Sequence, residues 1–190
     1  MSQVELAPAA RQALREQLRL ADAFEDAEHD PKYLINEIRY FDPVTQKWVE
    51  FRMFPPEGWV APLERERNGY GDDLRFLDPS LGAQDWLWQS VVIDWLHDPQ
   101  IHAYLVYKAR QLGITLLACA YSLWLMLMRP GTNCAAYSYE ETEAQKLTQA
   151  VWDMFKSLPP IFTRHVEIVT PTKGAIPSEW IRLRHPDGRI

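Results

Sequence analysis

The pattern of hydrophobic and polar residues first shows a helical period near the N-terminus. In residues 8–27, PAARQALREQLRLADAFEDA, the apolar residues Leu14, Leu18, Ala21 and Phe24 recur at helical spacing, with charged residues between them. Apolar positions three or four residues apart form one face of an α-helix. The pattern therefore predicts an amphipathic helix over 8–27 that docks on the rest of the domain or on a partner.

A period of two replaces the helical period in residues 35–54, INEIRYFDPVTQKWVEFRMF. Aromatic or branched residues alternate with polar ones in both arms, and Asp42-Pro43 marks a turn, which predicts a β-hairpin. Residues 55–83 are rich in Pro, Gly and Asp and show no regular period, so we expect a long irregular connection. Asp72-Asp73 within it could bind a cation, but a solvated turn is the simpler interpretation.

Helices and strands are expected to alternate from residue 84 onward. Helical patterns begin near residue 84 and cover 114–128 and 139–157, where Ser138 and Glu141 have the form of a capping box. Strands are predicted at 103–107, 133–138, 165–169 and 179–184. Such alternation predicts an α/β fold with a parallel sheet and helices on its faces. We expect three regions: an N-terminal helix (1–30), a hairpin with its connection (31–83) and the α/β core (84–190).

Composition narrows the class of protein. The 190 residues carry a formal charge of −6, which is unfavourable for a dedicated nucleic-acid binder, although the last 27 residues are more basic than the rest. The longest apolar run, 114–128, is shorter than the roughly 20 residues of a membrane span, and no signal peptide is expected. Cys119 lies in the apolar helix and Cys134 in a strand expected to be buried. These features favour a cytoplasmic domain without disulfides or a structural metal.

The loop between the strand 103–107 and the helix 114–128 carries the candidate chemistry. Aligned with the phosphate-binding pattern GxxxxGK[ST], the sequence KARQLGIT (108–115) keeps the second glycine at Gly113 and the hydroxyl residue at Thr115. Ile114 replaces the lysine, and Lys108 or Arg110 could supply the missing positive charge from the start of the loop. An ordinary strand-to-helix turn remains the alternative interpretation of these residues.

The combination of segments resembles the large terminase subunit of tailed phages, the ATPase that packages DNA into capsids. KARQLGIT resembles the deviant Walker A motif of that family, and WQSVVIDWL resembles its upstream adenine-contacting segment. The strand and helix in 133–162 and the hairpin 37–56 are similar to family segments as well. The resemblance covers residues 35–54 and 84–190 and implies a P-loop NTPase-like parallel sheet, preceded by the N-terminal helix and β-hairpin.

The resemblance also implies a set of site residues. Arg110 and Lys108 would contact the phosphates, with Arg110 as the catalytic cation, and Gln89 would contact adenine. Thr115 would hold Mg²⁺ with bound ATP. The implied nucleotide-binding residues are Gln89, Lys108, Ala109, Arg110, Gln111, Leu112, Gly113, Ile114 and Thr115. Each also has a purely structural interpretation: Gln89 as a solvated helix residue, Lys108 as a strand end and Thr115 as a helix start.

One departure from the family pattern concerns hydrolysis. Family members carry a Walker B strand that ends in an Asp-Glu pair and, further on, a nuclease domain, and no apolar run ending in two acids follows residue 138 here. We therefore expect an N-terminal fragment of a longer protein that binds ATP but hydrolyses it poorly, because positioning the attacking water is a large part of phosphoryl-transfer catalysis. An incomplete sheet would leave an exposed edge strand that can pair with other chains.

Three functions remain open from the sequence. The first is the nucleotide-binding part of a DNA-packaging motor in the cytoplasm of the infected host. Its partners would be duplex DNA, the small terminase subunit and the portal protein, within a homo-oligomeric ring and without a membrane. The second is another P-loop nucleic-acid-dependent ATPase of helicase type. The third is a non-enzymatic α/β interaction module that docks through the helix 8–27, and it predicts no nucleotide affinity.

Overall fold

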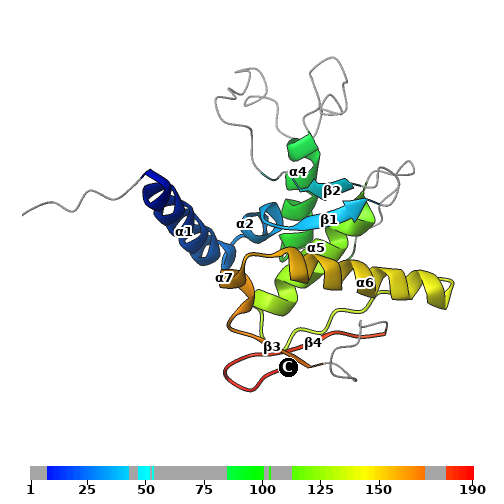
Figure 1. Cartoon of the computed structure of the whole chain (residues 1–190). Helices are drawn as coiled ribbons and strands as arrows, with labels where there is room; N and C mark the ends of the chain where they lie inside the picture. Colours follow the sequence, from blue (N-terminus) through cyan, green and yellow to red (C-terminus); the bar gives the residue numbers. More distant parts are fainter. Residues whose placement is uncertain are drawn as a thin grey trace, which may run out of the picture.

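The computed structural model is a mixed α/β domain (Figure 1). It describes residues 8–42, 47–51, 53, 85–100, 103, 113–169 and 179–190, and the statements below refer to these residues. The helices are α1 (Pro8–Ala27), α2 (Pro31–Asn36), α4 (Asp85–His97), α5 (Ile114–Met128), α6 (Glu141–Ser157) and α7 (Pro160–Thr163). The strands are β1 (Arg39–Asp42), β2 (Lys47–Glu50), β3 (Glu167–Val169) and β4 (Arg182–Arg184). None of the described helices is long and apolar enough to cross a membrane.

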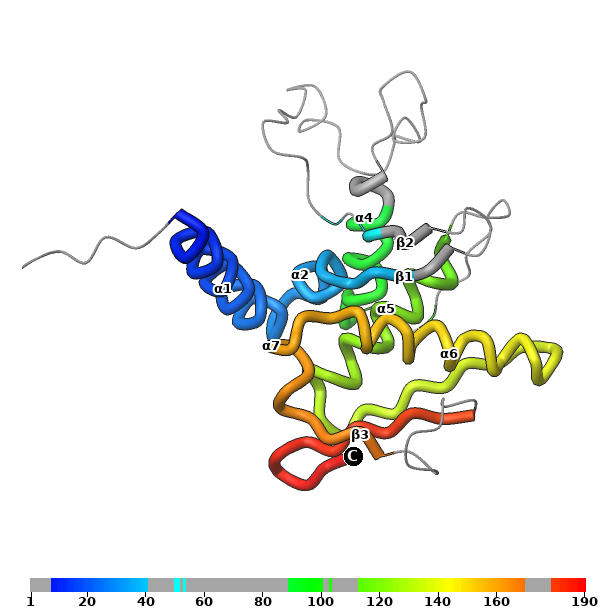
Figure 2. The backbone as a smooth tube through the Cα atoms, viewed as in Figure 1, coloured from blue at the N-terminus to red at the C-terminus, as the bar shows by residue number. Residues whose placement is uncertain are grey.

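Helix α5 is the centre of the hydrophobic core. It packs against α2, α4 and α6, which surround it in Figure 2. Leu117, Ala120, Leu123, Trp124 and Leu127 are all buried, and they recur at spacings of three or four residues. Most of the remaining α5 side chains are at least half-buried, which agrees with the continuous apolar sequence ITLLACAYSLWLMLM. The prediction of a helix over 114–128 is confirmed with the same bounds.

The short helix α2 separates α1 from the first hairpin. Asp30 is its N-cap and accepts a hydrogen bond from the backbone N–H of Lys32 at 2.9 Å, and Pro31 occupies the first helical position. Both features stabilise a helix start. Leu34 and Ile35 are buried against the core. The pattern analysis missed this helix because its apolar residues were assigned to the first strand, which in fact begins at Arg39.

Two antiparallel hairpins complete the described structure. In the first, β1 pairs with β2 in a register that joins Tyr40 to Val49, which confirms the predicted hairpin. The backbone N–H of Arg39 donates to Ser157 Oγ at 2.9 Å, which fixes this hairpin to the end of α6. In the second, β3 pairs with β4, joining Ile168 to Leu183. Strands were predicted at both positions of the second hairpin, within 165–169 and 179–184.

The expected parallel sheet is not found among the described strands, which form only two separate two-stranded antiparallel sheets. Residues 133–138 are not a strand, and their side chains are exposed, so the prediction of a buried strand here was wrong. Of the predicted strand 103–107, only Ala103 belongs to the described residues. The capping box was also wrong: the N-cap of α6 is Glu140, and it makes no side-chain cap hydrogen bond.

Two histidines of the C-terminal region contact the end of α5. Nε2 of His185 lies 2.9 Å from the carbonyl oxygen of Met126, and Nε2 of His165 lies 3.4 Å from that of Leu127. Carbonyl groups in the last turn of a helix lack partners within the helix. The two rings lie side by side, with centroids 5.9 Å apart, and Nδ1 of His165 is buried without a hydrogen-bond partner among the described atoms. The second hairpin is thereby joined to the core.

Acidification is expected to destabilise the fold through His165. Burial lowers the pKa of His165, and the neighbouring His185 and Arg164 lower it further, while the contact with the Leu127 carbonyl raises it. Below about pH 6.5, the ordinary histidine value, the unfolded chain therefore takes up the proton more readily than the folded one. Stability is full above that pH and is lost as the pH falls through the folded-state pKa.

Urea unfolding of the intact chain from about pH 8 to about pH 5 measures this effect. The decrease in the free energy of unfolding should be smaller in a His165→Gln variant and unchanged in His29→Gln, which alters an exposed histidine. An equal decrease in all three proteins would contradict the assignment to His165.

Candidate functional site

The N-terminus of α5 is the described part of the predicted phosphate-binding loop. Gly113 precedes the helix with φ 69° and ψ 3°, and its carbonyl oxygen accepts the first helical hydrogen bond, from Leu117 N at 2.9 Å. The N–H groups of Ile114, Thr115 and Leu116 therefore lie before the first intrahelical bond, as in any helix start. No acidic residue occupies the first turn. The positive end of a 15-residue helix is thus left without a neutralising carboxylate from that turn.

Gly113 is required by the backbone and not by crowding. Its φ lies in the left-handed region, where side chains other than those of Asn and Asp are rare. A Cβ atom built at Gly113 would meet no described atom within 4 Å. The glycine therefore sets the direction in which the chain enters α5.

Thr115 and Ile114 take the places that a phosphate-binding loop gives to a hydroxyl residue and a lysine. Thr115 is exposed on the first turn of α5, and Ile114 is half-buried. The hydroxyl of Thr115 is therefore accessible. Lys108, Ala109, Arg110, Gln111 and Leu112, the other predicted loop residues, lie outside the described residues.

Gln89 lies on the second turn of α4 and is half-buried. The C-terminal end of α4 contacts the middle of α5, where His97 Nδ1 lies 3.3 Å from the hydroxyl of Tyr121. Both helices run in the same general direction, so their N-terminal ends lie on the side of the molecule that carries the first hairpin (Figure 2).

The arrangement fits an anionic group better than a directly bound metal. The first N–H groups of a helix, which the helix itself does not bond, form a common phosphate-binding element. Among the described residues there is no cluster of three or more His, Cys, Asp or Glu side chains that could hold a metal ion. A Mg²⁺ ion that arrives with a nucleotide needs few protein ligands, because phosphate oxygens and water supply most of its coordination. The exposed Thr115 hydroxyl could provide one such ligand.

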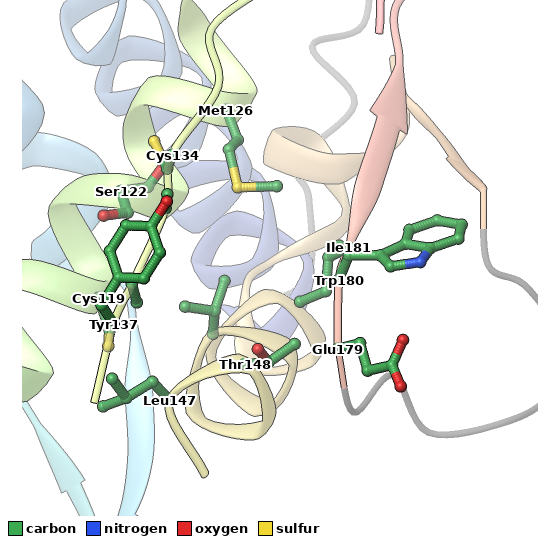
Figure 3. Close-up of a pocket in the computed structure, with 13 residues that line it drawn as sticks. Cys119, Ser122, Met126, Cys134, Tyr137, Leu147, Thr148, Glu179, Trp180 and Ile181 are labelled. Atoms are coloured by element: carbon green, nitrogen blue, oxygen red, sulfur yellow. The ribbon is translucent and has the colours of Figure 1, made fainter. Parts of the chain in front are cut away.

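A separate pocket of about 300 Å³ lies further along α5. Figure 3 shows it between α5, the segment 134–137, α6 and the residues before β4, with Met126 and Ile181 directed into it. Its described lining residues are Cys119, Ser122, Met126, Cys134, Ala135, Ala136, Tyr137, Leu147, Thr148, Val151, Glu179, Trp180 and Ile181. The sequence analysis missed it because the segment 133–138 was assigned to a sheet that would have filled this space.

The chemistry of this pocket does not suit a nucleotide or a nucleophilic reaction. No described lining residue is basic, and Glu179 adds a negative charge that disfavours phosphate. Burial raises the pKa of the Cys119 thiol to about 11, so this cysteine stays protonated and unreactive at neutral pH. The pocket is therefore a mainly apolar hollow beside the core, and the N-terminus of α5 remains the candidate functional site.

Comparison with known proteins does not add to this assignment. No protein-family model, curated protein or solved structure matches the chain. The functional interpretation therefore depends on two kinds of observation. One is the local geometry at Gly113 and the buried helix that follows it. The other is the motif KARQLGIT together with the surrounding segments, which carry the resemblance to the large terminase subunits.

Proposed function

We propose that this chain is the nucleotide-binding part of a viral DNA-packaging motor of the large-terminase type. The observation that supports it most directly is the left-handed Gly113 at the start of the buried helix α5, at the end of the motif KARQLGIT. A loop that must hold phosphate against backbone N–H groups needs a residue that permits such a backbone path. Within this proposal the sheet between the helices is parallel, and the strand 103–107 leads into the loop.

The proposed roles of the residues follow from charge and position. The N–H groups of Ile114, Thr115 and Leu116 would bind phosphate oxygens at the positive end of α5. Arg110 or Lys108 would place a cation beside the same phosphates, in place of the lysine that Ile114 replaces. Thr115 would hold the Mg²⁺ that accompanies ATP, which shields charge on the β- and γ-phosphates when bound. Gln89 would contact adenine from α4.

In this proposal the whole motor would move duplex DNA, with a small terminase subunit and a portal protein as partners, in a homo-oligomeric ring in the host cytoplasm. The printed sequence has no apolar run that ends in Asp-Glu after residue 138. No carboxylate is therefore assigned to activate the attacking water. We expect this chain to bind Mg·ATP and to hydrolyse it slowly, since loss of a general base typically lowers a rate by about 10²–10⁴.

Titration of the intact chain with Mg·ATP by calorimetry tests the proposal through Gly113. Gly113→Val should weaken binding at least about tenfold, because a β-branched residue is strained at positive φ and would turn the N–H groups away from the phosphates. Gly113→Asn is the matched control, since asparagine tolerates this conformation and no described atom crowds the position. Its affinity should stay close to that of the original chain.

Thr115→Val tests the metal contact in the same titration. Threonine and valine have nearly the same shape, so only the hydroxyl is lost. The affinity gained on adding Mg²⁺ should shrink, while the affinity for ATP without Mg²⁺ should be unchanged. Absence of ATP binding by a chain that is folded by circular dichroism would count against the proposal and favour the non-enzymatic interaction module.

A further inference from the structure

Within the described part of the chain, helix α1 packs on the core through its C-terminal half. Ala23 and Ala27 are buried, and Leu20 and Phe24 pack against the core. Its main contacts are with α2 and α7, and its N-terminal half projects away from the other described elements (Figure 1). An isolated helical segment of this length gains little stability from its own hydrogen bonds. A projecting helix therefore benefits from a partner.

The orientation of α1 on the domain is fixed by polar contacts. Arg19 binds Glu37 outside the helix at 2.6 Å, and Nε1 of Trp124 donates to the carbonyl oxygen of Ala27 at 2.6 Å. A second ion pair within α1, from Arg19 to Glu16 at 2.8 Å, holds the guanidinium in place. These contacts come from one side and from the C-terminal end of the helix. They fix the rotation of α1 about its axis, so the face of α1 opposite to these contacts points away from the domain.

The face of α1 that points away from the domain is apolar at its centre. Leu14 and Leu18 are 46% and 57% exposed, although both are large apolar residues. At 100° per residue, Leu18 lies on the side of the helix opposite to Ala23 and Ala27. The positions 11, 14, 18, 21 and 25 follow the alternating spacing of three and four residues that forms the seam between two paired helices.

The charges at the two ends of this seam are opposite. Arg11 and Arg15 lie at its N-terminal end, and Asp22 and Glu25 lie at its C-terminal end, all of them exposed. An identical helix that runs in the opposite direction would place its acidic end beside the basic end of the first helix. A uniformly anionic partner, such as DNA or an acidic lipid surface, would be repelled by Asp22 and Glu25. The charge pattern favours a second copy of the same helix.

We propose that α1 is a self-association surface through which two copies of this chain pair by an antiparallel contact of their α1 helices. In the register that places Leu18 against its counterpart, Arg11 meets Glu25 and Arg15 meets Ala21 beside Asp22. Each such contact occurs twice, as a two-fold symmetric interface requires. This inference does not depend on nucleotide binding, and a two-fold pairing is distinct from closure of a ring.

Sedimentation equilibrium of the intact chain, from low micromolar to several hundred micromolar, measures the association. A monomer–dimer equilibrium is expected, and Leu18→Glu should weaken it at least about tenfold, because two carboxylates would meet at the centre of the contact. Gln12→Glu, which introduces the same group at an exposed position on the flank of α1, should change the equilibrium little. Thermal unfolding of both variants checks that the domain remains folded.

Charge exchange tests the antiparallel register. Arg11→Glu alone and Glu25→Arg alone should each weaken the dimer, since each variant brings like charges together twice. An equimolar mixture of the two single variants should associate again, because every end contact between unlike chains then joins opposite charges. The double variant Arg11→Glu/Glu25→Arg should also associate. In a parallel pair, position 11 would meet position 11 and position 25 would meet position 25, so the original chain would already bring like charges together and neither single variant would weaken the dimer. Loss of association in each single variant, followed by recovery in the mixture, therefore identifies the antiparallel register.

A cysteine cross-link provides a second measurement. In a Cys134→Ser background, Leu18→Cys should form a disulfide-linked dimer under mild oxidation, and Leu14→Cys should not, because position 14 lies far from its own counterpart in an antiparallel pair. Monomers at every concentration, or a dimer that survives Leu18→Glu unchanged, would overturn the proposal. Binding of α1 to acidic vesicles or to DNA in place of self-association would overturn it too.

Discussion

Replacing Trp124 by alanine is expected to destabilise the protein by about 3–5 kcal/mol, the range for removing a large aromatic side chain from a core. Trp124 is 0% exposed and is among the largest fully buried side chains of the described core. Its ring stacks on Tyr121 with centroids 5.5 Å apart and meets the edge of His97 at 5.0 Å. Arg129 lies over the ring at 5.1 Å. One side chain therefore joins α4 and α5 and is close to the end of α5.

The contribution of the Trp124 hydrogen bond to stability can be measured separately from that of its ring. Its Nε1 donates to the carbonyl oxygen of Ala27, in the last turn of α1, where the helix itself supplies no donor. Trp124→Phe keeps a large ring and leaves that buried carbonyl without its donor, which costs about 1–3 kcal/mol. Trp124→Phe should therefore lie between the original protein and Trp124→Ala in stability.

Urea unfolding followed by circular dichroism measures both substitutions. Trp95→Ala is the matched control, because Trp95 is 49% exposed on α4, and it should change stability by much less than Trp124→Ala does. A similar loss for Trp95→Ala and Trp124→Ala would show that Trp124 does not have the central role assigned to it. If Trp124→Phe were as stable as the original protein, the hydrogen bond to Ala27 would contribute little.

The elements that could be predicted from the sequence are those in which the periodic spacing of apolar residues continues over many residues. The bounds of α1 and α5 agree with the predictions, because their apolar spacing persists over four or more turns. The first hairpin was also predicted, since alternating residues and turn signals are local features. The strands of the second hairpin were predicted, but their antiparallel pairing was not. Local patterns of this kind do not depend on how distant segments are arranged.

The wrong predictions concern short apolar segments, which can fold as a strand, a helix or an irregular segment. Residues 133–138 were assigned to a buried strand from their apolar content, but no described strand pairs with them. Whether such a segment enters a sheet depends on partners elsewhere in the chain, which periodicity does not reveal. The helix α2 was missed for a related reason, since its capping by Asp30 and Pro31 was not weighed against the β pattern that follows.

The part of the candidate site that the sequence could indicate is the backbone conformation at one glycine. Gly113 was chosen from a motif in which only the glycine and Thr115 match, and the structure gives this glycine a left-handed backbone before a buried helix. Gln89 lies on α4, which the sequence predicted as a helix, and α4 packs against α5. The role of Arg110 could not be derived in the same way, because a long flexible side chain can reach a phosphate from several loop positions.

Replacing Arg110 by alanine is expected to lower the affinity for Mg·ATP by about 10- to 100-fold, the effect of losing a hydrogen bond of about 1.5–3 kcal/mol to a charged group. The physical reason is the missing lysine. Ile114 brings no charge to the first turn of α5, so under the proposed function the cation would come from an earlier position of the motif. Arg110→Lys should retain part of the affinity, since it keeps the charge and loses the two parallel hydrogen bonds that a guanidinium can make.

Rescue by a lysine at the usual motif position is the decisive comparison. The double variant Arg110→Ala/Ile114→Lys should recover much of the lost affinity, because a cation then enters the site from the first turn of α5. Arg164→Ala, which removes an exposed arginine beside α7, controls for a general effect of net charge. Because Ile114 is half-buried, unfolding curves must show that the double variant is folded.

If Arg110→Ala bound as tightly as the original chain while Lys108→Ala did not, the phosphate contact would belong to Lys108. If neither substitution mattered, KARQLGIT would be an ordinary turn into α5.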